Sequence, residues 1–199
     1  HDGQISGGQG TLNDHGDRTI IGNSTPRYNF GLILDASYRG FDISAFFQGV
    51  GKRDFMAPSG EKGAMFWGAV NNLYQSVGLE EHWDYFRPEE HEMGANLDAY
   101  YPRPDLSTLK NQQAQTRYLQ NAAYIRLKNI QIGYTFPKAW TRKVGLNKCR
   151  IYISGDNLWT GSKIASMYDP EGLGSMNDWG AGKTYPLSKV ISCGVNINM

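Results

Sequence analysis

YNFGLILDASY, residues 28–38, is the stretch that decides the fold, because its apolar and polar residues alternate. The even positions carry Tyr, Phe, Leu, Leu, Ala and Tyr, whereas the odd positions carry Asn, Gly, Ile, Asp and Ser. A period of two gives a β-strand one apolar and one mostly polar face. Arg39-Gly40 then predicts a tight turn, after which the alternation resumes over FDISAFFQGV, residues 41–50. Phe46 is an exception on the polar side, but the two runs together predict a β-hairpin.

Three further strands are expected later in the chain, over residues 118–136, 149–159 and 186–199. In the first of these, Ile125 and Leu127 have one parity whereas Ile130, Ile132, Tyr134 and Phe136 have the other. One extra residue in a strand restores a single apolar face. We therefore expect a β-bulge near Lys128-Asn129.

The connections between the expected strands alternate in length. Residues 39–40 and 137–148 are short connections, whereas 51–117 and 160–184 are long ones, the first with a short helix expected over 69–78. Transmembrane β-barrels have short periplasmic turns and long extracellular loops. There is no run of about 18 apolar residues, which excludes a transmembrane helix but not a weakly patterned barrel strand. Strands of ten residues or more favour a barrel, but the alternation alone leaves a soluble β-sandwich open.

Five stretches, in chain order, carry a resemblance to a known family. They are DRTIIGNSTPRYNFGL (17–32), FDISAFFQGVGKRD (41–54), QTRYLQNAAYIRLKNIQIGYTFP (115–137), RIYISGDNLWT (150–160) and YPLSKVISCGVNINM (185–199). Together they resemble the closing strands of the SusC/RagA proteins, the TonB-dependent outer-membrane transporters of Bacteroidota. The resemblance implies an all-β fold in which residues 1–199 supply the C-terminal antiparallel strands of a large transmembrane barrel. The plug domain and the earlier strands would lie outside this chain.

The resemblance also implies a function. Members of this family import glycan fragments or peptides across the outer membrane of Gram-negative bacteria. A SusD-like surface lipoprotein caps the barrel, and the TonB complex supplies energy through an N-terminal part. The barrel strands would contact the lipid bilayer. The alternative from the residues alone is a soluble carbohydrate-binding β-sandwich whose aromatic loops hold the glycan.

Candidate contact residues lie in the long segment 51–117. Trp67, Trp83, Tyr100 and Tyr101 are suited to stacking on sugar rings or packing against a capping lipoprotein, but they are equally suited to burying one another. At the N-terminus, HDGQIS resembles the tail of an Asp-rich segment similar to a calcium loop. The resemblance makes calcium ligands of Asp2, Asp14 and Asp17, the alternative being solvated loop carboxylates.

Other chemistry is not indicated. A formal net charge of +1 argues against a nucleic-acid partner. The sequence contains no P-loop, GxSxG or HExxH motif, so we expect no catalytic residues and no enzyme. Cys149 and Cys193 are expected to be free thiols on the apolar face, with Cys149 opposite Val195 and Cys193 opposite Ile151.

Overall fold

The computed structural model describes residues 6–58, 78–104, 113–174 and 182–199. Its main feature is a five-stranded antiparallel sheet, which we call the long sheet, with the order β1-β2-β5-β6-β7. The strands are β1 (Arg27–Tyr38), β2 (Phe41–Lys52), β5 (Tyr124–Thr135), β6 (Lys148–Ser162) and β7 (Val190–Asn198). Every neighbouring pair is antiparallel. The expected all-β class is therefore confirmed as a mostly β fold built on an antiparallel sheet.

The strand register collects the apolar residues of all five strands on one face. Phe41 of β2 lies opposite Tyr38 of β1 and Tyr134 of β5. Ile153 of β6 lies between Ile132 of β5 and Cys193 of β7. Because side chains alternate along a strand, these cross-strand pairs place the polar residues together on the opposite face. Within the described residues no second sheet covers the apolar face, where many large side chains are exposed.

A bulge at Lys128 keeps the apolar face continuous. Phe46 pairs with Asn129 and Phe47 with Leu127, so that Lys128 is the extra residue on β5. The pairing of β5 with β6 shifts at the same place, next to Asn157, whose φ is 53°. The bulge therefore lies where the change of parity predicts it. It allows Leu127 and Ile130 to share one face although their sequence parity differs.

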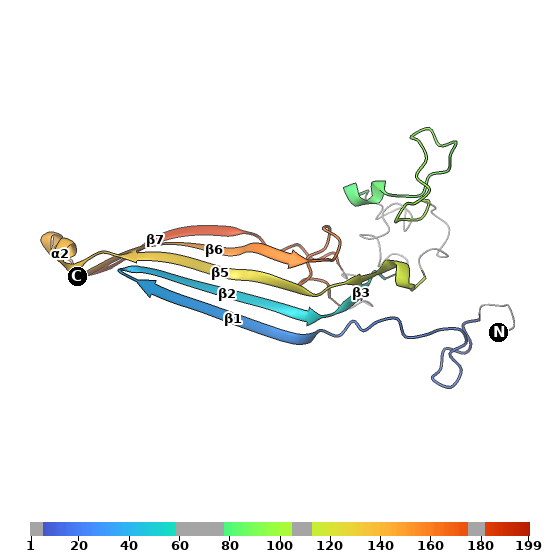
Figure 1. Ribbon diagram of the computed structural model, residues 1–199, viewed down its shortest axis with the longest axis horizontal. Helices are drawn as coiled ribbons and strands as arrows, with labels where there is room; N and C mark the ends of the chain where they lie inside the picture. The colour runs from blue at the N-terminus through green and yellow to red at the C-terminus, as the bar shows by residue number, and fades with distance from the viewer. Residues whose placement is uncertain (1–5, 59–77, 105–112, 175–181) are drawn as a thin grey trace.

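The two ends of the long sheet differ (Figure 1). At one end lie the β1–β2 turn, α2 (Lys138–Thr141) and the short 3₁₀ helix Arg142–Val144. The turn is tight because Arg39 and Gly40 both have positive φ, 47° and 92°. At the other end lie the long connections. Among the described residues no helix has the length and apolar character needed to cross a membrane.

The long connections fold into a unit of their own, which we call the loop head. It comprises residues 53–58, 78–104, 116–122 and 163–174 and includes the two-stranded sheet of β3 (Asp54–Met56) and β4 (Leu119–Asn121). Short 3₁₀ helices occur at Glu80–Trp83 and Thr116–Tyr118. The buried apolar cluster lies here: Phe55, Met56, Ala57, Tyr101, Tyr118, Ala122, Ile164, Tyr168 and Leu173. The packed core is thus in the loops rather than on the long sheet.

Three details differ from the sequence prediction. The expected strand 118–136 is divided, because Leu119–Asn121 pairs with β3 and only Tyr124–Thr135 joins the long sheet. The last hairpin is shifted by two residues, so Cys149 lies opposite Ile197 and Cys193 opposite Ile153. A shift of two keeps every side chain on its face, which is why the alternation does not reveal it. Both thiols are free, as predicted, whereas residues 69–77 of the expected helix lie outside the described residues.

Candidate functional site

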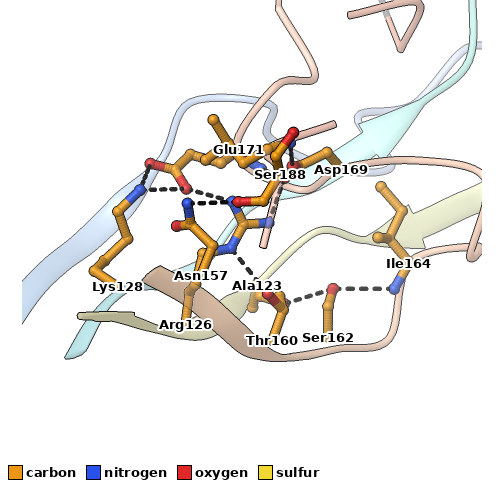
Figure 2. A network of polar contacts seen from close by, with 11 residues as sticks. Ala123, Arg126, Lys128, Asn157, Thr160, Ser162, Ile164, Asp169, Glu171 and Ser188 are labelled. Carbon is orange, nitrogen blue, oxygen red and sulfur yellow. Dashed lines mark hydrogen bonds and ion pairs between the residues drawn. The ribbon is translucent and has the colours of Figure 1, made fainter. Parts of the chain in front are cut away.

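A buried group of charges joins the long sheet to the loop head (Figure 2). Arg126 of β5 donates to Thr160 Oγ1 at 2.8 Å, to Asp169 Oδ1 at 2.6 Å and to Glu171 Oε2 at 2.7 Å. Lys128 Nζ lies 3.1 Å from Glu171 Oε1. We call these residues the junction network. Arg126 points to the polar face, where it lies opposite Gln48 of β2, and the bulge residue Lys128 reaches the same carboxylate of Glu171.

The centre of the network is deeply buried and is satisfied by specific partners, whereas Lys128 and Glu171 are partly exposed. The side chains of Arg126 and Asp169 are each 5% exposed. The carboxylate of Asp169 also accepts the backbone N–H groups of Glu171 and Leu187, at 3.0 Å each. Burial by itself would raise the pKa of Asp169, but these hydrogen bonds and the Arg126 charge outweigh it and leave the pKa below its ordinary value. Asp169 is therefore ionised at neutral pH. Through the N–H groups of Glu171 and Leu187 it joins two separate parts of the loop between β6 and β7.

A pocket of about 320 Å³ opens beside this network. Its lining includes Arg126, Asn157, Thr160, Asp169, Leu187 and Lys189. Asn157 Nδ2 donates to the Ser188 carbonyl at 3.2 Å, whereas Asn157 Oδ1 is buried with no hydrogen-bond partner among the described residues. The pocket therefore has a mixed polar lining at the loop end of the polar face.

The aromatic candidates differ in how far they are exposed. Tyr101 is 7% exposed and stacks edge-on against Tyr100, with ring centroids 5.0 Å apart. Tyr100 in turn stacks on Tyr118 at 5.5 Å. Burial raises the pKa of Tyr101 well above its ordinary value, so its hydroxyl stays protonated. Trp83 is not part of the buried cluster and is 60% exposed, while Trp67 lies outside the described residues.

The acidic candidates hold local turns. Asp14 Oδ2 accepts the N–H of Gln9 at 3.1 Å, and Asp17 Oδ2 accepts the N–H of Ser6 at 2.7 Å. Asp2 lies outside the described residues. Within the described part of the chain, no group of His, Cys, Asp and Glu is arranged to hold a metal ion.

A second polar cluster crosses three strands at the other end of the polar face. Arg150 of β6 forms an ion pair with Asp42 of β2 and donates to Gln131 Oε1 of β5 at 3.0 Å. Its guanidinium also lies 5.2 Å from the Tyr152 ring centroid. Gly133 leaves room for this arrangement, because a Cβ there would collide with the guanidinium.

Sequence reasoning singled out neither of these two clusters. Arg126, Lys128 and Arg150 were visible as basic residues of a segment without acids. Their carboxylate partners Asp169, Glu171 and Asp42 come from distant parts of the chain, and nothing local in the sequence joins them. The available signal was a charge on the polar face of a long strand, which requires a partner when it is buried.

Comparison with known proteins gives the relationship of the chain. No family model matches it. It is 33% identical over 145 residues to TonB-dependent receptor P3 of Formosa agariphila, covering 72% of this chain and 13% of that receptor. TonB-dependent receptor P26 of the same organism is 22% identical over 213 residues, covering 98% of this chain and 20% of that receptor. The chain thus spans one fifth or less of the length of these curated relatives.

Solved structures agree with this relationship at the level of the fold. The RagAB peptide importer in its open-open state matches with a TM-score of 0.61 and 23% identity, over 90% of this chain and 18% of that chain. A structure of the RagAB peptide transporter matches with a TM-score of 0.63 and 23% identity, over 89% and 18%.

The long sheet and the folded loops at one end thus match part of the fold of the RagAB structures, and the relatives in sequence are TonB-dependent receptors. The chain belongs to the TonB-dependent receptors, and it shares the fold of part of the RagAB structures. Its homologues are transporters rather than enzymes, and their family implies the outer membrane.

Proposed function

We propose that this chain forms a C-terminal section of the barrel wall, together with its outer loops, in an active importer of a Gram-negative outer membrane. The observation that carries the proposal is the separation of apolar and polar residues on opposite faces of all five long strands. Lipid contacts the apolar face, and the polar face lines the lumen. Barrel strands alternate in this way because one side meets hydrocarbon and the other meets water.

Strand length supports this orientation. Each of β1 and β2 has 12 residues. At about 3.3 Å per residue and a tilt near 40°, such a strand rises about 28 Å, which spans an apolar band about 25 Å tall. The short connections then lie on the periplasmic side and the loop head outside, as is typical of outer-membrane barrels.

The cargo is proposed to be peptide or glycan fragments, captured with a SusD-like surface lipoprotein and moved with energy from TonB through an N-terminal part. The similar solved structures are of a peptide importer, which favours peptides. Trp83 is the candidate for contact with cargo or lipoprotein because it is exposed, whereas Tyr100 and Tyr101 pack against each other inside the loop head. We also propose, from the resemblance of the N-terminal segment to a calcium loop, that Asp2, Asp14 and Asp17 bind calcium.

A matched pair of arginine substitutions in the intact receptor tests the assignment of faces. Ile132 is 45% exposed on the apolar face, and Ser154 belongs to the polar face of the neighbouring strand. Ile132→Arg near the midplane should destabilise the folded receptor by about 2–4 kcal/mol, whereas Ser154→Arg should cost much less. Reversible unfolding in lipid vesicles measures both. Equal costs would mean that the assignment of lipid and lumen is wrong.

Uptake then tests the cargo. Cells that carry the intact receptor as their single route are supplied with either labelled oligopeptides or labelled oligosaccharides. Peptide uptake that is lost when TonB is removed supports the proposal in its peptide form. Uptake of neither class by a folded receptor would contradict it.

A further inference from the structure

The short-connection end of the long sheet carries an unusual concentration of positive charge. Arg39 in the β1–β2 turn and Lys138, Arg142 and Lys143 around α2 are all exposed. We call these residues the basic rim. Residues 136–148 contain no Asp or Glu. Among the described residues, no ion pair includes any member of the rim.

Asp42, an acidic residue of β2 that follows the turn, is already paired. Asp42 forms an ion pair with Arg150, and the charge of Lys148 also acts on it. Asp42 therefore does not neutralise the rim. The loop head has the opposite character, with Glu80, Glu81 and Asp84 close together. The two ends of one sheet thus differ in charge.

A row of aromatic rings leads from the apolar face to the basic rim. The centroids of Phe41 and Tyr134 are 4.6 Å apart, and Tyr134 lies 5.2 Å from Phe136. Phe136 in turn lies 6.4 Å from Trp140, a residue of α2 that is 61% exposed. Arg39 extends this pattern to the turn, where its guanidinium lies 5.1 Å from the Tyr38 ring centroid. The rings follow the border between the apolar face and the charged end.

We propose that the basic rim binds the anionic headgroups of membrane phospholipids, with Trp140 lying at the level of the interface. Tyrosine and tryptophan prefer the boundary between hydrocarbon and headgroups, which sets the depth of the rim. Lysine and arginine at that depth meet lipid phosphates, and basic clusters beside a membrane-spanning element attract anionic lipids. This inference rests on the proposed orientation of the sheet in the membrane. It adds that the receptor prefers anionic phospholipids on the side of the membrane where the short connections lie.

The experiment compares two triple variants of the intact receptor in bilayers of phosphatidylglycerol and phosphatidylcholine. The test variant is Lys138→Gln, Arg142→Gln and Lys143→Gln. The control variant, Arg27→Gln, Lys52→Gln and Lys163→Gln, removes the same charges at the loop end of the same sheet, where all three residues are exposed. Spin-labelled phosphatidylglycerol and phosphatidylcholine report the relative affinity of the receptor surface for each lipid.

The wild-type receptor should prefer phosphatidylglycerol at low salt, and the test variant should lose at least about fivefold of that preference, the order expected for one headgroup contact. The control variant should retain it. An inserted wild-type receptor without preference, a test variant that retains it, or an equal loss in the control would each overturn the inference and leave the proposed function standing. A wild-type receptor that does not insert into the bilayer would overturn both.

Discussion

The long sheet and the loop head are built from the same chain but are stabilised in different ways. In the loop head, Phe55 and Leu173 are 1% and 0% exposed, so apolar side chains pack against one another. On the long sheet, Leu34 and Ile153 are about half exposed, at 51% each. The loop head buries its apolar side chains against one another, whereas the apolar face of the long sheet is exposed to the surroundings. The comparison teaches that here the loops, rather than the regular strands, have the core of a water-soluble protein.

The largest effect is expected from removing the charge that joins the long sheet to the loop head. Arg126→Ala would leave Asp169 and Glu171 without their buried partner, although Lys128 still contacts Glu171. Removing one partner of a buried pair costs about 3–5 kcal/mol. We expect the loop after β6 to open while the strand pairing persists. Hydrogen exchange of residues 163–174 and of β6 measures the two regions separately, and equal loss of protection in both would contradict the contrast.

A cavity in the loop head should act on the head alone. Leu173→Ala removes a fully buried side chain, at a cost of about 2–5 kcal/mol. The matched change on the sheet, Leu34→Ala, affects a half-exposed side chain on the apolar face and should cost less than about 1.5 kcal/mol in lipid. Limited proteolysis of the head and thermal unfolding of the intact receptor compare the two. A larger effect of Leu34→Ala would mean that the sheet is the more tightly packed region.

Acid should destabilise the loop head more than the long sheet, because it protonates the junction network and leaves the apolar face unchanged. The pKa of Asp169 is lowered in the folded state, so its stabilising effect is present above the ordinary value of 3.8 and is lost as the pH falls through the lowered value. Protection of the head from proteolysis by pepsin should therefore decline below about pH 3.8. Asp169→Asn should be less stable at pH 7 and less dependent on pH in this range. An unchanged pH profile in that variant would assign the acid sensitivity to other groups.

The smallest effect is expected on the sheet itself, at its cysteines. Cys149 and Cys193 lie on adjacent strands, but Cys193 pairs with Ile153, four residues beyond Cys149. Peptides from denatured, unreduced receptor should take one thiol-blocking group at each of the two positions. Cys193→Ala, a change on an exposed part of the apolar face, should change stability by less than about 0.5 kcal/mol. A peptide pair that resists blocking until it is reduced would contradict the observed register.

The sequence was informative about the sheet and poorly informative about the head, for a physical reason. A period of two is a local signal, so the hairpin at Arg39-Gly40 and the bulge at Lys128 were both predictable. The resemblance over five stretches supplied the family. The pairing of β3 with β4 joins residues 65 or so positions apart without a local pattern, and the Arg126–Asp169 pair joins β5 to a glycine-rich loop in the same way. The aromatic candidates show the same limit, because the types of Tyr101 and Trp83 do not say which one is buried.

The outer strands of the long sheet carry one further consequence. In the described residues β1 pairs only with β2 and β7 only with β6, so each has one edge with unpaired backbone amides and carbonyls. Such an edge is a template for the addition of another strand, and in hydrocarbon it must be paired. Residues 1–199 produced in isolation should therefore stack edge to edge into insoluble fibres. In a working receptor, neighbouring strands must pair with these two edges. Folding of this segment alone therefore does not complete the assembly of the sheet.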